Sequence, residues 1–343
     1  MRRGSSGLSL VVGVDKPAGM SSHDVVDRCR RIFGERRVGH AGTLDPAASG
    51  VLPVLVGPAT RLDAYLSGHD KRYLARIVFG VGTDTDDAEG AVVSRAPVPA
   101  RLRDAQQARA YLDSIVGEHM QLPPVYSAIK VGGRKACDEA RAGSLIDLSA
   151  RKVAVYEARL IRVLDEDPAD DAPLSSDYAA WDVDLRVSKG TYIRAIARDA
   201  GRDLGCPAHL GALERTAVGR LSLDDCVGLA ALSQVKEAAA LDPVALLGLR
   251  IVFADGALER RVAAGAAFPA GEAALFESRS AADGTACPCT SGVYRSCEGA
   301  RDGEVVSVVA GNRLVALYEN DGAAGLFKAR CVFSTGVCRG CAV

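Results

Sequence analysis

The chain has 343 residues, of which 48% are hydrophobic and 25% are charged, a composition typical of a soluble globular protein that can bury a sizeable core. At about 150 residues per domain, this length predicts two domains. The 42 lysines and arginines nearly balance the 43 aspartates and glutamates. This balance excludes a uniformly basic chain but leaves room for a local basic face.

The apolar runs and the cysteines bear on where the protein works. No run approaches the roughly 18 to 20 apolar residues that span a bilayer, and the short apolar run at residues 8–14 stops at the polar residues 15–17. We therefore expect neither a membrane segment nor a secretory signal. The ten cysteines are then expected to be free thiols in a reducing cytosol rather than a disulfide framework.

The first segment predicts a strand followed by a short amphipathic helix. Residues 8–14 favour the strand, and Ser21 with Asp24 three residues later resembles a capping box before apolar residues that recur at helical spacing up to Phe33. The outer face and exit of this helix carry five arginines: Arg28, Arg30, Arg31, Arg36 and Arg37. On charge alone they indicate either a solvated surface or a nucleic-acid contact.

Residues 39–50 consist mainly of small residues and precede the apolar run 51–56, which predicts an ordered loop that enters a buried strand. Asp45 before Pro46 is by itself a common turn, and His40 alone is an ordinary loop histidine. However, the small neighbours leave the Asp45 carboxylate sterically open. Asp45 is therefore also a candidate nucleophile or base.

Two later segments have clear strand periodicity. Tyr73 begins an alternation of apolar residues, and alone it would be an ordinary core aromatic residue. Residues 181–187 also alternate, and they lead through the turn at 188–191 into an amphipathic helix. Arg194 lies in the first turn of that helix, where a positive charge opposes the helix dipole, so we expect it to have an anionic partner.

The segment between these strands and the end of the chain have distinct compositions. Residues 122–143 are rich in proline and then basic, residues 165–171 resemble a solvated acidic loop, and short strands in a Gly/Ala-rich context follow Gly248. The last part predicts a small separate β domain. Its notable cysteines are Cys287, Cys289, Cys297, Cys338 and Cys341. Because a structural zinc site usually needs two well-separated C-x2-4-C pairs, free thiols are favoured here, and metal binding stays open.

Several common chemistries lose support because their motifs are missing. The sequence contains no G-x-x-x-x-G-K-[ST] loop, no G-x-G-x-x-G after a strand, no H-E-x-x-H and no G-x-S-x-G. These absences argue against nucleotide hydrolysis and dinucleotide redox chemistry.

As a set, the motifs resemble the TruB-type tRNA pseudouridine synthases, in the order of that family from residue 9 to about residue 220. The matching segments are residues 15–22 (DKPAGMSS), 39–50 (GHAGTLDPAASG), 71–73 (KRY), 82–86 (GTDTD), 123–130 (PPVYSAIK) and 188–194 (SKGTYIR). Residues 305–333 resemble, more weakly, a PUA-type RNA-binding domain.

The resemblance implies roles for individual residues. Asp45 matches the family's catalytic aspartate, and Arg194 matches the arginine that pairs with it. Tyr73 matches the tyrosine that stacks on the target base, and His40 matches the histidine associated with flipping out that base.

Tyr192 and Leu213 match residues that line the uridine pocket of the family. The chain departs from the family pattern at Ala41 and Ser49, where threonine is usual, and at Cys137, where a tyrosine is common. The small substitutions leave the chemistry intact, whereas the loss of an aromatic residue in the RNA-clasping region is expected to alter tRNA contacts.

The implied reaction breaks the N1–C1′ bond of uridine, rotates the base and forms a C5–C1′ bond, which requires no redox change, metal or cofactor. Asp45 could attack the sugar, attack the pyrimidine ring or remove a sugar proton, and the sequence leaves these alternatives open. Extruding the uridine costs a few kcal/mol, and stacking on an aromatic residue such as Tyr73 offsets about 1 to 3 kcal/mol. The basic clusters at residues 28–37 and 130–141 are then expected to bind phosphates.

We therefore expect an α+β enzyme with a central mixed or antiparallel sheet. Its catalytic domain would span residues 1–248, including an RNA-clasping segment at about 122–150, and a PUA-like domain with an unmatched Cys-rich insertion and tail would span residues 249–343. The expected activity is isomerisation of uridine 55 in the T loop of tRNA by a cytoplasmic monomer that needs no protein partner and no membrane.

Two alternative functions stay open. One is an RNA-binding or RNA-folding module whose catalytic step is dispensable, although intact Asp45, Tyr73 and Arg194 argue against a purely non-catalytic protein. The other is an enzyme for other RNA, since related proteins with a similar core work in guide-RNA complexes. Nothing here resembles the long basic tails of those relatives, which favours a stand-alone enzyme.

Overall fold

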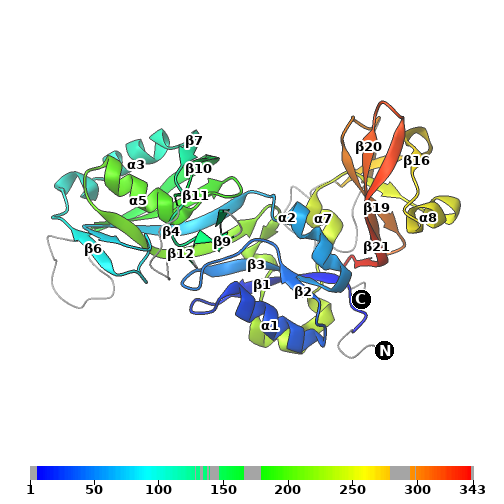
Figure 1. Cartoon of the computed structure of the whole chain (residues 1–343), viewed down its shortest axis with the longest axis horizontal. Helices are drawn as coiled ribbons and strands as arrows, with labels where there is room; N and C mark the ends of the chain where they lie inside the picture. The colour runs from blue at the N-terminus through cyan, green and yellow to red at the C-terminus, as the bar shows by residue number, and fades with distance from the viewer. Residues whose placement is uncertain are drawn as a thin grey trace. The chain divides into compact units, whose positions relative to one another are not determined.

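The computed structural model describes residues 6–127, 129–131, 134–136, 139, 147–165, 179–278, 294–297 and 299–340. The chain forms two compact units, of which the first comprises residues 1–46, 50–68 and 217–343 and the second residues 47–49 and 69–216 (Figure 1). Several positions singled out in the sequence lie outside the described residues: Cys137, Arg141, residues 166–171 of the acidic loop, Cys287, Cys289 and Cys341.

The N-terminal part of the first unit is a small mixed sheet. Its strands are β1 (Leu10–Lys16), β2 (Val38–His40), β3 (Ser49–Val56) and β14 (Val227–Gly228). β1 runs antiparallel to β3, with Val14 opposite Leu52, and parallel to β14, while β2 pairs with the other edge of β3.

β1 is apolar at nearly every position because both of its faces are buried. Val12 and Val14 pack in one cluster with helix α1 (Ser22–Phe33), whereas Val11 belongs to a second cluster on the opposite face. Successive side chains of a strand point to opposite faces, so a continuous apolar run is what burial on both sides requires.

The expected helix begins and ends where the sequence indicates. The Ser21 side chain accepts a hydrogen bond from the Asp24 N–H, and the Asp24 carboxylate accepts one from the Ser21 N–H, so the capping box is complete. The helix ends at Gly34, whose φ of 59° is the left-handed conformation that glycine adopts without strain.

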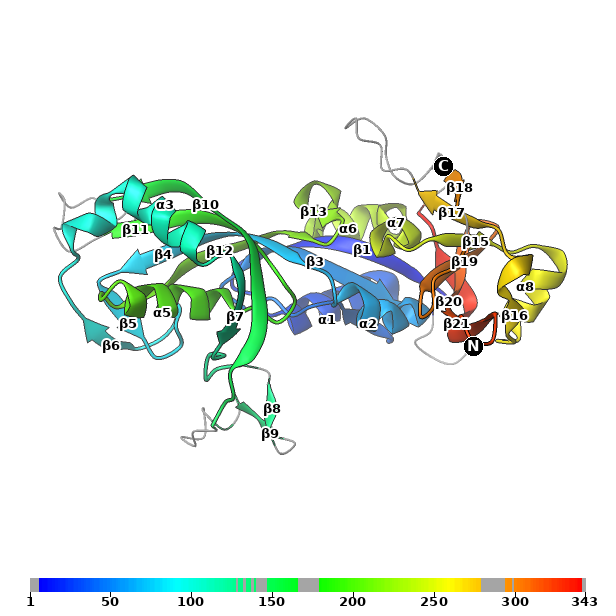
Figure 2. The ribbon, with the colours of Figure 1, turned by 90° about the horizontal axis from the view of Figure 1, so that it is seen from above.

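The second unit has an antiparallel sheet in the order β12-β4-β11-β10-β7. These strands are β4 (Lys71–Phe79), β7 (Gly117–Gln121), β10 (Arg151–Leu164), β11 (Ala179–Val187) and β12 (Ala208–Val218). Helix α3 (Ala105–Ser114) packs on β10, and helix α5 (Ile193–Asp203) packs on β4 (Figure 2). Trp181 on β11 is fully buried, and its indole N–H donates to the Leu102 carbonyl at 2.8 Å.

Short elements connect these layers. The strands are β5 (Val81–Thr83), β6 (Val92–Arg95), β8 (Lys130–Val131), β9 (Arg134–Lys135) and β13 (Leu221–Ser222), and the helices are α2 (Asp63–Leu66), α6 (Leu229–Val235), α7 (Pro243–Leu247) and α8 (Gly256–Ala263). In the described part of the chain, no helix has both the length and the apolar character needed to cross a membrane.

The C-terminal part of the first unit is a seven-stranded sheet in the order β16-β21-β20-β19-β15-β17-β18. Its strands are β15 (Ile251–Phe253), β16 (Phe268–Pro269), β17 (Leu275–Ser278), β18 (Tyr294–Cys297), β19 (Val305–Ala310), β20 (Arg313–Asp321) and β21 (Leu326–Cys338). This sheet fits the expected PUA-like β domain, and with the mixed sheet it confirms the α+β class.

The C-terminal sheet shares a core with the N-terminal strands. Leu314 and Leu317 on β20 belong to the same buried cluster as Val11 and Leu55. Backbone bonds reinforce this contact, because the Cys338 N–H donates to the Ser9 carbonyl at 2.8 Å. The first unit therefore includes residues 217–343, and a domain boundary after residue 248 stays a prediction.

A chain that ends at residue 248 should be strongly destabilised. The cut removes the apolar partners of Val11 and Leu55, and the loss of even one large core side chain costs about 2 to 5 kcal/mol. We expect a lower midpoint of thermal unfolding for the truncated chain. Leu317→Ala in the full chain should lower this midpoint by a smaller amount. A truncated chain that unfolds at the temperature of the full chain would contradict the shared core.

Candidate active site

The loop that carries Asp45 is fixed at its N-terminal side by helix α1. The Ser22 hydroxyl donates to the Leu44 carbonyl at 2.8 Å and accepts from the Leu44 N–H at 2.9 Å. Ser22 and Leu44 are both buried, whereas the next residue, Asp45, is partly exposed. The backbone is thus anchored immediately before the carboxylate while the carboxylate itself stays accessible.

The same loop is fixed at its C-terminal side by Lys16. This lysine is fully buried, and its Nζ donates to the carbonyls of Pro17, Met20 and Pro46 at 2.9, 2.6 and 3.2 Å. A buried ammonium group is stable only when its donors are satisfied. Lys16, at the end of β1, therefore connects the loop that follows this strand to Pro46, the residue after Asp45.

His40 is the last residue of β2, where it is paired with Val54 of β3, and it is partly buried. The next residue, Ala41, donates its N–H to the Pro53 carbonyl at 2.9 Å, and its side chain is fully buried in an apolar cluster. Ala41, which stands where the family usually has threonine, therefore has a small apolar side chain that suits its buried position. Both His40 and Asp45 belong to the first unit.

Arg194 in the second unit has the anionic partner that its position predicts. It is buried in the first turn of α5, where its guanidinium lies 3.5 Å from the Asp87 carboxylate. It also donates to the carbonyls of Thr85 and Tyr126, at 3.2 and 3.1 Å. The ion pair with Asp87 offsets the unfavourable helix dipole, and pairing with Asp45 stays a prediction.

Tyr192 is positioned by a glutamine that the sequence patterns did not single out. The Tyr192 N–H donates to Gln121 Oε1 at 2.9 Å, and Gln121 Nε2 donates to the Tyr192 carbonyl at 3.1 Å. Gln121 is buried at the end of β7 and gives the Tyr192 N–H an acceptor before the helix begins, while the Tyr192 carbonyl also accepts from the Ile196 N–H at 3.1 Å. The Tyr192 side chain packs against a buried cluster that includes Ile129 and Leu148.

Tyr73 lies on β4 opposite Leu185 and is buried. Lys71, two residues earlier and thus on the same face of the strand, is also buried and donates to the His69 carbonyl at 2.6 Å. Burial, reinforced by the positive charge of Arg215, lowers the pKa of Lys71 to about 8.

Leu213 is on β12, which neighbours β4 in the sheet, and its side chain is partly exposed. The second unit thus brings Tyr73 and Leu213 onto adjacent strands and Tyr192 and Arg194 onto one helix start. Lys16 and Ser22 lie within the matching segment 15–22, but the sequence assigned no role to them or to Gln121, because each acts through a residue at least 22 positions away.

The described cysteines do not form a metal centre. Among the described residues, no group of three or more histidine, cysteine, aspartate or glutamate side chains is arranged to hold a metal ion. The Cys297 and Cys338 thiols donate to the carbonyls of Arg295 and Gly340, respectively.

Comparison with known proteins places these features in one family. The model of the TruB family pseudouridylate synthase (N terminal domain) matches residues 30–193. The tRNA pseudouridine synthase B of Thermobifida fusca (strain YX) is 42% identical over 312 residues, which cover 90% of this chain and 94% of that relative. The enzyme of the same name from Mycobacterium sp. (strain KMS) is 48% identical over 225 residues, covering 65% of this chain and 71% of the relative.

Solved structures agree on the fold. A chain of a Cbf5-Nop10-Gar1 complex matches 96% of this chain and 86% of its own length with a TM-score of 0.60 and 23% identity. A chain of an H/ACA RNP bound to a substrate RNA matches 94% of this chain and 84% of its own, with the same TM-score and 22% identity. At 42% identity across 90% of its residues with a curated relative, the chain belongs to the TruB family of pseudouridylate synthases.

Proposed function

We propose that this protein isomerises uridine 55 in the T loop of tRNA to pseudouridine, with Asp45 as the catalytic carboxylate and without a metal or cofactor. The observation that carries this proposal is the anchored loop, in which Ser22 and Lys16 fix the backbone on both sides of an accessible aspartate. The names of the curated relatives, tRNA pseudouridine synthase B, support tRNA as the substrate.

The anchored loop suits the chemistry of the reaction. A carboxylate can act on the sugar or the base as nucleophile or as base, and its rate depends on how well the reacting atoms are oriented. Because the backbone of Leu44 is bonded to Ser22 and that of Pro46 to Lys16, the backbone at Asp45 is already held in place before substrate binds.

The aromatic and apolar residues of the second unit supply the pocket in this proposal. Tyr73 would stack on the extruded uridine, and Tyr192 and Leu213 would line the space around it. Stacking on an aromatic residue returns about 1 to 3 kcal/mol toward the few kcal/mol that extrusion costs. His40 would occupy the place that the uridine leaves, and Arg194 would pair with Asp45 in addition to Asp87.

The proposal also covers the assembly and the C-terminal sheet. We propose that the chain acts alone as a cytoplasmic monomer and that residues 249–343 bind tRNA without taking part in the chemistry. The likeness to chains of Cbf5 and H/ACA complexes concerns the fold.

Asp45→Asn should abolish pseudouridine formation in unmodified tRNA, because the amide cannot act as nucleophile or base. Binding of tRNA should stay within about tenfold, since one charge is a small part of an interface dominated by phosphate contacts. Site-specific detection of pseudouridine and a binding assay measure the two effects. Asp63→Asn, at an exposed aspartate of the same unit, is the control, and turnover by Asp45→Asn would refute the catalytic assignment.

Arg194→Met should destabilise the fold by about 3 to 5 kcal/mol, because it leaves the Asp87 carboxylate, whose side chain is only 13% exposed, without its guanidinium partner. It should also reduce turnover strongly. The control is Arg202→Met on the same helix, where the side chain is 68% exposed and an ion pair contributes about 0 to 1 kcal/mol. Equal unfolding free energies of the two variants would show that the pair of Arg194 and Asp87 does not stabilise the fold.

A further inference from the structure

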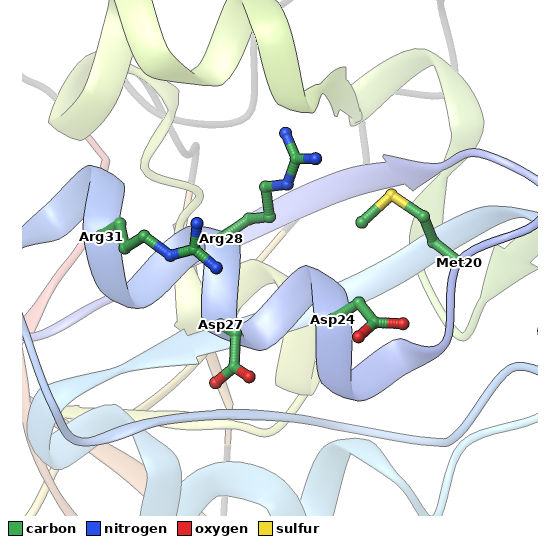
Figure 3. Close-up of a pocket in the computed structure, with 5 residues that line it drawn as sticks. All are labelled: Met20, Asp24, Asp27, Arg28 and Arg31. Carbon is green, nitrogen blue, oxygen red and sulfur yellow. The ribbon is translucent and has the colours of Figure 1, made fainter.

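Helix α1 has two hollows along its solvent side, and one arginine lines both. The first, of about 340 Å³, is lined by Met20, Asp24, Asp27, Arg28 and Arg31 (Figure 3). The second, of about 520 Å³, lies at the helix end and is lined by Arg30, Arg31, Gly34, Glu35 and Arg36. Because Arg31 contributes to both, the two hollows follow each other along the helix.

The carboxylates that line these hollows are already engaged. Asp24 accepts from the backbone and hydroxyl of Ser21, and Asp27 pairs with Arg30 at 2.6 Å. Glu35 accepts from the Arg37 N–H at 3.0 Å and from Ser6.

Three exposed arginines have side chains without a hydrogen bond or ion pair in the described part of the chain: Arg28, Arg31 and Arg36. We call these three residues the arginine strip. In Figure 3 the Arg28 side chain extends away from the carboxylates of Asp24 and Asp27.

The arginine strip is not explained by the needs of the helix. Arg31 lies in the last turn, where a positive charge is favourable. Arg28 lies in the middle of α1, and Arg36 lies beyond its end at Gly34. Neither residue is therefore stabilised in this way by the helix dipole. Three guanidinium groups that form no salt bridge with a described carboxylate form a surface that complements a chain of phosphates.

The arginine strip is also mechanically joined to the catalytic loop. It lies on and just beyond the helix whose first residue, Ser22, binds both backbone groups of Leu44. A ligand bound along α1 would therefore be positioned relative to Asp45 within the first unit.

We propose that the arginine strip binds successive phosphates of the substrate tRNA backbone, outside the target uridine. This inference rests on the proposed function, because it takes tRNA as the substrate. It assigns the arginines of residues 28–37 unequal roles, since Arg30 and Arg37 are engaged within the protein, Arg30 with Asp27 and Arg37 with Thr60.

The test is the salt dependence of tRNA binding by Arg28→Gln/Arg31→Gln in the full chain. Each lost phosphate contact lowers the slope of log K against log salt by about 0.7 to 0.9, so the double variant should lose about 1.4 to 1.8 from the slope. The same relation gives roughly 15- to 30-fold weaker binding at 0.15 M salt. Unmodified tRNA is the probe, and circular dichroism checks that the variant is folded.

Two further variants separate a local contact from bulk charge. Arg95→Gln/Arg109→Gln removes the same charge from exposed residues of the second unit that have no ion pair in the described ranges, and it should weaken binding less than about threefold. Arg28→Lys/Arg31→Lys keeps the charge and should restore most of the slope.

The outcomes distinguish this proposal from the proposed function. An unchanged slope and affinity in the Arg28→Gln/Arg31→Gln variant, with pseudouridine still formed by the wild-type protein, would overturn the arginine strip alone. An equal loss in the Arg95→Gln/Arg109→Gln control would overturn it as well, because the effect would then be one of total charge. Wild-type protein that neither binds nor modifies tRNA would overturn both proposals.

Discussion

The buried ammonium group of Lys16 is the interaction on which the arrangement of the N-terminal region depends. Its Nζ is surrounded by three carbonyl oxygens, two from the loop after β1 and one from Pro46. Removing any of these acceptors would leave part of a charged group unsatisfied in the interior, which costs more than an ordinary hydrogen bond contributes. This requirement fixes two loops at once, and Ser22 adds a second attachment next to Asp45.

Buried polar residues of the second unit also need partners for their hydrogen-bond donors. Arg194 and Gln121 are both buried, and each donates to backbone carbonyl groups of a segment distant in the chain. Such contacts specify a single arrangement because a displaced loop would leave a buried donor unpaired. The residues expected to contact the base are therefore supported by side chains that need not touch it.

Local sequence patterns predicted those features that depend on neighbours in the chain. The capping box at Ser21, the strand around Tyr73 and the position of Arg194 in the first turn of a helix were all readable from spacing. The partners Asp87 and Gln121 were not, since they lie 107 and 71 residues from the residues they bind. The small residues around Asp45 made it a candidate nucleophile or base, whereas the roles of His40 and Leu213 came from the family resemblance, because their local patterns are those of ordinary loops and strands.

The shared core of the first unit has a consequence for biosynthesis. Strand β1 is synthesised well before its neighbour β14, which starts at Val227, and before its packing partners on β20 and β21. Contacts between such distant segments form slowly because a long loop must close first. The face of β1 that carries Val11 therefore lacks these partners until residues 313–338 have been made, a period in which chaperones that bind exposed apolar segments would have an opportunity to act.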